Sequence, residues 1–180
     1  MKRISVLAPL LALFALAAEA PPLYVGYFGA GASEAYGQTI TAPLTRPYKF
    51  SFWINLPAHV GFRGEVRLWT AAGAGALLWA SQVQHTNGSG DFERIEFLPA
   101  TGTEQDPPAA CTLECVLLVT VRDVANNPGF GAVEVAREPY AGGEFVFRNR
   151  KLDGTQGPWI RGYLRGGDLR FDASVTEAAQ

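Results

Sequence analysis

Residues 140–149 read YAGGEFVFRN, and residues 168–173 read DLRFDA. Alternate residues of a β-strand lie on the same face. Each segment therefore has one apolar face to bury and one polar face to leave in water. The apolar faces comprise Phe145 and Phe147 in the first segment, and Leu169, Phe171 and Ala173 in the second. We predict two strands here, joined by an irregular polar arm that carries Trp159.

The same alternation recurs along the chain and is clearest in residues 48–56, YKFSFWINL. Alternate residues from Tyr48 to Leu56 are apolar, whereas Trp53 lies on the other, polar face. Residues 114–123 are almost continuously apolar, which is typical of a central strand covered on both faces. The remaining predicted strands are 23–29, 36–41, 62–71, 77–84, 92–98 and 132–136.

The connections are rich in turn-forming residues, with 20 Gly and 12 Pro in 180 residues. Residues 72–76 are predicted as a Gly/Ala turn, and Asn87-Gly88 is a strong signal for a hairpin that joins 77–84 to 92–98. Many short strands with frequent turns are typical of a sandwich. We predict one all-β domain, residues 21–180, folded as a single antiparallel β-sandwich of jelly-roll type with about ten short strands.

Residues 1–20 have the pattern of a secretory signal peptide. Lys2 and Arg3 precede an apolar run over residues 4–18, and small residues then offer cleavage sites within 17–21. An uncleaved membrane anchor is the alternative, but the run is short for a span of about 20 residues. We expect a mature chain without a transmembrane segment, secreted or located in the periplasm or cell envelope.

The charges of the chain are few and mixed. The formal net charge is −2, and both signs are interspersed along the sequence. No basic field is present to attract nucleic acid or an anionic membrane. Nucleic acid is therefore not an expected partner.

Two cysteines, Cys111 and Cys115, are present in the whole chain. Export favours a disulfide between them. Within one extended strand their Cα atoms would stand roughly 13 Å apart, whereas a disulfide requires about 7 Å or less. A bridge is possible if Cys111 still belongs to the preceding proline-rich loop, and it would stabilise the fold by about 2 kcal/mol. The pair alone does not suit zinc, which takes four ligands.

Several short signatures together resemble a group of exported bacterial β-sandwich domains. These domains often occur in proteins with a C-terminal PEP-CTERM sorting tail. The signatures are YGQTITAP at 36–43, FSF at 50–52, YAGG at 140–143, FVFRN at 145–149, Trp159, and DLRF at 168–171. The resemblance spans nearly the whole mature chain and implies the fold and the export. It implies no catalytic residues.

Residues suited to catalysis show no recognisable arrangement. The two histidines lie in predicted loops, outside any nucleophile motif, and are His59 and His85. Glycosidases use two carboxylates that flank the scissile bond. Glu93 and Glu96 point to opposite faces of their strand, and Asp168 and Asp172 would stand roughly 13 Å apart. We expect no enzymatic activity.

A structural calcium ion is the cofactor for which candidate ligands exist. The candidates are Asp153, Asp168 and Asp172, or Asp123 with Asn126 and Asn127. Neither set has the spacing of a calcium-binding loop. Solvated acidic residues in turns are the simpler interpretation, so no cofactor is predicted.

Aromatic residues on polar strand faces are the strongest functional signal. Trp53 and Trp69 occupy such positions, and Trp159 in the arm is a third candidate. Flat rings stack on the C–H faces of sugars while neighbouring polar groups bind the hydroxyls. The candidate neighbours are Glu65, Arg67, Lys49 and Asn55. The alternative interpretation is that a second layer or a loop buries these rings.

These observations favour a secreted, non-enzymatic binding or adhesion module with extracellular polysaccharide as its ligand. One alternative is a structural envelope or matrix protein that contacts other proteins. A small hydrolase is less favoured. Exposed rings of Trp53 and Trp69 in one plane would favour sugar binding, whereas buried rings and an apolar patch elsewhere would favour protein contacts.

Overall fold

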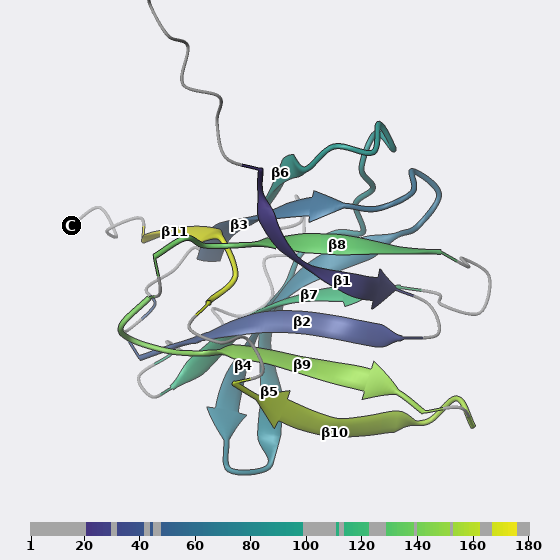
Figure 1. Ribbon diagram of the computed structural model, residues 1–180. Helices are drawn as coiled ribbons and strands as arrows, with labels where there is room; N and C mark the ends of the chain where they lie inside the picture. Colours follow the sequence, from purple (N-terminus) through teal and green to yellow (C-terminus); the bar gives the residue numbers. More distant parts are fainter. Residues whose placement is uncertain are drawn as a thin grey trace, which may run out of the picture.

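The computed structural model describes residues 21–29, 32–41, 44, 48–98, 111, 114–122, 129–138, 140–151, 153–162 and 167–175. Within these residues the fold is all-β, with eleven strands and no helix (Figure 1). The prediction of an all-β fold with about ten strands is therefore confirmed. The predicted leader, residues 1–20, lies outside the described residues.

The strands form two layers. The first layer has the order β6 (Glu93–Phe97), β3 (Tyr48–Asn55), β8 (Phe130–Val135) and β1 (Leu23–Gly29), and β11 (Phe171–Val175) pairs with β3 on the β8 side. The second layer has the order β10 (Gln156–Arg161), β9 (Phe145–Arg150), β2 (Ser33–Ile40), β7 (Cys115–Val121), β4 (Phe62–Thr70) and β5 (Gly73–Ala80). A single parallel contact, Phe28 with Ser33, joins β1 to β2, and the other described strand pairs are antiparallel.

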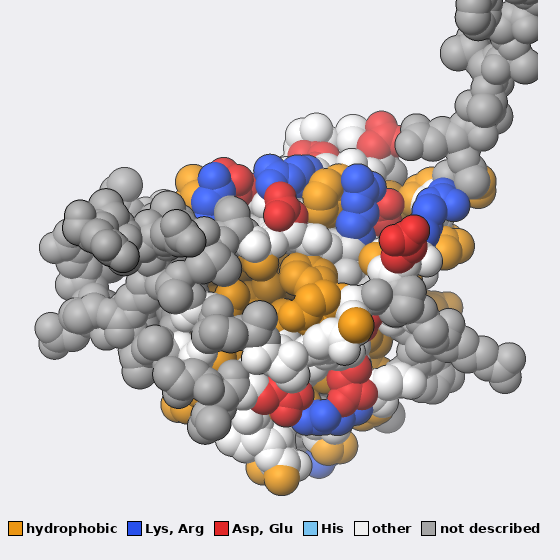
Figure 2. Space-filling model, turned by 90° about the vertical axis from the view of Figure 1, so that its left-hand side faces the viewer, with side chains coloured by type: hydrophobic (Ala, Val, Ile, Leu, Met, Phe, Trp, Pro, Cys, Tyr) orange, Lys and Arg blue, Asp and Glu red, His pale blue; other side chains and the backbone are white. Residues whose placement is uncertain are grey.

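The hydrophobic core fills the space between the two layers. Phe62 of β4 contacts Phe97 of β6 across this space, with ring centroids 6.2 Å apart, and Phe50 of β3 contacts Trp79 of β5 at 5.9 Å. Figure 2 shows apolar side chains gathered in the middle of one end of the molecule, between charged groups above and below. Each fully buried side chain of this size contributes about 1.5–3 kcal/mol.

Strand β7 is buried on both faces, as its continuous apolar sequence predicted. Leu117 and Val119 point into the core between the layers. Val116 and Leu118 point the other way, into a second and smaller apolar cluster. A buried cluster therefore exists on the outer side of the second layer.

Two predicted connections were wrong. Strand β5 begins at Gly73, so the predicted turn at 72–76 is largely strand, and Gly73 supplies the positive φ of +101° that this tight turn requires. The predicted Asn87-Gly88 hairpin does not form, because β6 pairs with β3 and not with β5. The segment instead crosses between the layers, where the Thr86 hydroxyl donates a 2.5 Å hydrogen bond to the Leu56 carbonyl.

The polar arm after β9 contains a strand that the sequence did not predict. Strand β10 includes Gly157 and Pro158, which are both unfavourable in a strand interior. Among the described strands β10 pairs only with β9, so it is an edge strand and tolerates the missing N–H of proline. Its pairing places Trp159 opposite Arg148.

The two cysteines occupy the positions that a disulfide requires. Cys111 makes an isolated bridge with Leu44, whereas Cys115 begins β7. The pair is bonded, with Cα atoms 6.2 Å apart, and both residues are fully buried.

In the part of the chain that the structure describes, no helix is long and apolar enough to cross a membrane.

Candidate functional site

The three candidate tryptophans lie on two different surfaces. Phe52 and Ile54 of β3 face the core, so Trp53 between them points outward from the first layer. Trp69 and Trp159 lie together on the outer side of the second layer. The common platform that Trp53 and Trp69 would make for a sugar is therefore absent.

Trp69 is enclosed by the curvature of the second layer, and the half-buried Trp159 packs against it. The two edge strands of this layer, β5 and β10, contact each other across the outer face. The two indole rings meet edge to face with centroids 5.6 Å apart, and only 6% of Trp69 is exposed. A Cβ atom on Gly73 would lie 2.3 Å from the Trp159 ring, so glycine is what permits this close approach. The pair completes a small apolar core.

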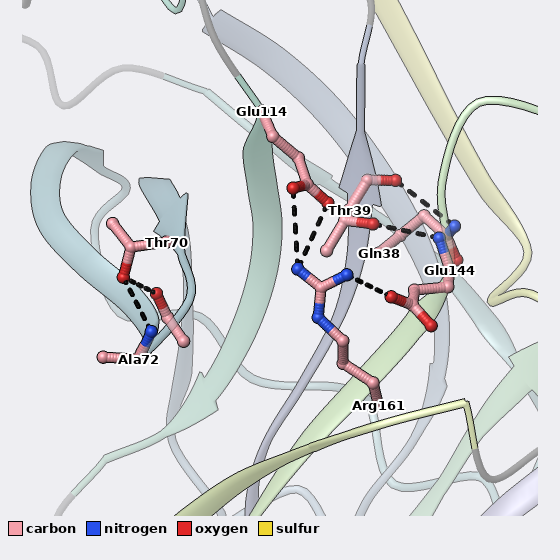
Figure 3. A network of polar contacts seen from close by, with 8 residues as sticks. Gln38, Thr39, Thr70, Ala72, Glu114, Glu144 and Arg161 are labelled. Atoms are coloured by element: carbon pink, nitrogen blue, oxygen red, sulfur yellow. Dashed lines mark hydrogen bonds and ion pairs between the residues drawn. The ribbon is translucent and has the colours of Figure 1, made fainter.

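Arginine side chains cover the rings of this pair. Arg161 lies over Trp69 at 4.9 Å, and Arg148 lies over Trp159 at 4.8 Å, at distances typical of cation–π contacts. Arg161 in turn makes ion pairs with Glu114 and Glu144, as Figure 3 shows. A sugar would have to displace these arginines, so the pair is not available as a stacking surface.

Glu65 and Arg67 belong to the same outer side but do not form an open polar site. Glu65 is 3% exposed and accepts hydrogen bonds of 2.7 Å from Arg63 Nε and Arg67 Nε. Burial by itself raises the pKa of the Glu65 carboxyl, but the hydrogen bonds and charges of Arg67 and Arg63 outweigh burial and hold it below its ordinary value. We infer that these residues stabilise strand β4 through their ion pairs.

Trp53 lines a groove of about 880 Å³ on the outer face of the first layer. The guanidinium of Arg170 lies over its ring at 3.9 Å, and that of Arg94 lies at 5.6 Å. Trp53 is half-buried, and a sugar that stacks on its ring would have to displace Arg170. The groove also has acidic and basic residues along its wall, including Glu134 and Arg137.

A second hollow of about 590 Å³ shares Gly90 and Phe92 with this groove. Its lining includes four aromatic residues that form two ring pairs. The pairs are Tyr24 with Phe92 at 5.9 Å, and Tyr27 with Phe130 at 6.1 Å. The exposed fractions are 62% for Tyr24, 71% for Tyr27 and 59% for Phe130. We name the surface of these two adjacent hollows, formed by Trp53, Tyr24, Phe92, Tyr27 and Phe130, the aromatic groove.

Polar groups accompany the rings of the aromatic groove. Asn55, which lines the second hollow, donates its side-chain amide to the Gly90 carbonyl, so the amide oxygen is held in a fixed orientation. The groove lies mainly on paired strands, because Tyr24 is opposite Glu134 on β8 and Asn55 is opposite Ala132. Tyr27 has a φ of +61°, which is rare for a residue other than glycine, and it interrupts the regular register of β1.

The sequence did not single out Tyr24, Tyr27, Phe92 or Phe130 as site residues. The first strand, LYVGYFG, is apolar on both faces, so its periodicity does not distinguish outward rings from core rings. The signal that was present is the pair of glycines around Tyr27, because glycine marks a possible irregularity in a strand. Of the predicted ligand-binding residues, the structure places Trp53 in the aromatic groove.

The other candidate residues do not converge on a site. His59 and His85 are exposed in loops, and a ring nitrogen of His85 lies 3.1 Å from the Ala58 carbonyl. The aspartates considered for calcium have separate partners: Asp153 binds Thr155, Asp168 binds Gln38 and Tyr140, and Asp172 binds Arg94. Among the described residues, no group of three or more His, Cys, Asp and Glu side chains is gathered for a metal ion. Asp123, Asn126 and Asn127 lie outside those residues.

Comparisons with known proteins do not assign the chain to a family. No protein-family model matches the sequence, and no curated protein or solved structure matches it significantly. The resemblance to PEP-CTERM-associated domains therefore stays a prediction.

Proposed function

We propose that this protein is a secreted, non-enzymatic binding module that holds extracellular polysaccharide in the aromatic groove. The observation that carries the proposal is the exposure of paired rings beside fixed polar groups on a sheet. Tyr24 and Tyr27 are 62% and 71% exposed, although tyrosine rings in a monomeric domain are usually much more buried.

The chemistry of the surface suits a sugar. Pyranose rings present C–H groups that pack on aromatic faces, while their hydroxyls require hydrogen-bond partners at the margin. The aromatic groove supplies both kinds of group, because Asn55 and the tyrosine hydroxyls stand beside the rings. The strands beneath it are paired on both sides over part of their length, which limits the entropy lost when a ligand binds.

A structural role in an envelope or matrix is the second candidate. Leu23, at the start of β1, is a further exposed apolar residue, at 54%, and it points to the opposite face of the strand from Tyr24. Exposed apolar patches are also typical of contacts between proteins. The burial of Trp69 together with an exposed apolar patch elsewhere also supports this role, which would use the same surface without any sugar.

Intrinsic tryptophan fluorescence can test the proposal, because Trp53 lies in the groove. Purified protein is titrated with a panel of soluble polysaccharides, beside the variants Tyr24→Ala and Tyr27→Ala. We expect a saturable change with at least one polysaccharide. Each variant should bind about threefold to tenfold more weakly, which corresponds to about 0.5–1.5 kcal/mol for one aromatic contact.

The matched control is Leu77→Ala on β5. Leu77 is 45% exposed and lies in the second layer, so its loss removes exposed apolar surface without touching the aromatic groove. Wild-type affinity in this control, with reduced affinity in both tyrosine variants, would support the proposal. If correctly folded wild-type protein binds none of the polysaccharides, the glycan proposal fails and the structural role gains.

A further inference from the structure

We infer that the aromatic groove selects an extended, uncharged glycan chain, and not an acidic polysaccharide or a single terminal sugar. The inference rests on the proposed function of the same groove and adds the class of ligand. Two independent features carry it: the pairing of the charges on this face, and the spacing of the rings.

The cations on the outer face of the first layer are paired with carboxylates. Arg170 makes two hydrogen bonds to Glu134, of 2.9 and 3.1 Å. The other ion pairs are Arg94 with Asp172 at 2.9 Å, and Lys49 with Glu96 at 3.0 Å. Three cations thus face three carboxylates, and their formal charges cancel.

The remaining charged residues of the groove wall do not favour an anion. They are Asp91, Glu138 and Arg137, so two carboxylates stand against one cation. The Arg137 guanidinium also donates a 3.0 Å hydrogen bond to the Pro21 carbonyl. An acidic polymer would therefore meet weak repulsion, or would have to break ion pairs that hold Arg170 and Arg94 over Trp53. A neutral chain meets no such repulsion, although stacking on the Trp53 ring would still require Arg170 to move aside.

The rings are too widely spaced for one sugar to contact them all. Strand pairing places Trp53 and Tyr24 on opposite sides of β8, because Ile54 pairs with Val133 and Tyr24 pairs with Glu134. Two strand spacings separate them by about 10 Å. Tyr27 lies three residues along β1 from Tyr24, which adds about 10 Å in the strand direction.

The hollows that contain these rings are adjacent. The hollow at Trp53 and the hollow at Tyr27 share Gly90 and Phe92 in their lining, so Phe92 lies at the junction. A ligand that uses both ends must be a chain of linked units. Each further unit that reaches a ring adds a contact without a new loss of translational freedom, so affinity should rise with chain length and then level off.

The inference is tested by calorimetry with a chain-length series. Neutral probes are cello-, xylo- and manno-oligosaccharides, from the monosaccharide to the longest soluble chain, and the acidic probe is polygalacturonate. We expect affinity to rise by about tenfold or more from the monosaccharide to the plateau. Tyr27→Ala should move the plateau to shorter chains, because it removes the ring at one end of the groove.

A charge variant tests the pairing of the charges. Glu134→Gln removes the carboxylate that pairs with Arg170, so we expect detectable binding of polygalacturonate at low salt that high salt abolishes. The matched control is Glu144→Gln, which also removes the partner of an arginine, Arg161, but on the second layer. This control should leave polygalacturonate unbound.

The outcomes separate this inference from the function on which it rests. Equal affinity for a monosaccharide and the longest chain would overturn the extended ligand. Tighter binding of polygalacturonate than of every neutral chain by the wild-type protein would overturn the uncharged ligand. In both cases a glycan-binding module would stand. Absence of binding to every probe by folded protein would overturn the inference together with the proposed function.

Discussion

Replacement of Glu65 by Gln is expected to destabilise the protein more than any loss of a surface carboxylate. Gln has nearly the same shape, so packing changes little, but it carries no charge. Arg63 and Arg67 both make ion pairs with the Glu65 carboxylate in the structure, and both would lose this partner in the variant. The side chain of Glu65 is only 3% exposed, so water cannot readily replace the missing charge.

The size of this effect follows from the exposure of the three groups. Removing one partner of a fully buried ion pair costs about 3–5 kcal/mol, because the other charge is left without compensation. The side chains of Arg63 and Arg67 are 24% and 28% exposed, and partial hydration lowers the cost. We expect a loss of about 3 kcal/mol in the free energy of unfolding.

Urea unfolding, followed by tryptophan fluorescence and circular dichroism, measures this loss. A decrease of about 3 kcal/mol should lower the urea midpoint by about 1 M or more. The difference between wild type and variant should narrow as the pH falls. The pKa of Glu65 is lower in the folded state, so its stabilisation is complete above the ordinary carboxyl range and is lost through the lowered pKa.

The matched control is Glu96→Gln. Glu96 also pairs with two cations, Lys49 and Arg94, but its side chain is 31% exposed and theirs are about 40% exposed. Surface ion pairs contribute about 0–1 kcal/mol, so this variant should lose little stability. A Glu65→Gln variant that is no less stable than Glu96→Gln would refute the reasoning about burial.

Two further predictions concern packing and ionisation. Gly64→Ala should cost about 1–3 kcal/mol in thermal or urea unfolding, because the new Cβ would lie 2.5 Å from the Phe97 ring; Gly75→Ala, whose Cβ would meet no atom closer than 3.4 Å, should be neutral. Burial raises the pKa of Tyr36, although its hydrogen bond with Ser33 acts in the opposite direction. Spectrophotometric titration should show one phenol that ionises at a pH above the ordinary tyrosine pKa, and Tyr36→Phe should remove this ionisation. The free energy of unfolding that the buried neutral phenol contributes should be lost as the pH rises through the raised pKa. Ionisation of every tyrosine at its ordinary pKa would contradict this.

Much of the fold follows from local sequence pattern. The alternation in residues 48–56 predicts which side of β3 faces the core, and Phe50, Phe52 and Ile54 are all fully buried there. The continuous apolar sequence of β7 predicts burial on both faces. Both predictions succeed because the repeat of two residues is a property of the extended backbone itself.

The pairing of strands is harder to predict from the sequence. The Asn87-Gly88 signal is local, but the partner of β6 is β3, far away in the chain. Strand β10 contains glycine and proline and is stabilised by its pairing with β9, which the sequence of β10 does not reveal. Contacts of this kind depend on the whole arrangement of the sheet, so tertiary context overrides local propensity.

By itself the sequence determined which rings of β3 and β4 point away from the core, since alternation placed Trp53 and Trp69 on outward faces. Only the tertiary structure decided which outward faces meet water. The curvature of the second layer brings β5 against β10 and encloses Trp69, whereas Tyr24 on the first layer remains exposed. The physical reason is that periodicity acts within one strand, while exposure depends on how distant strands cover one another.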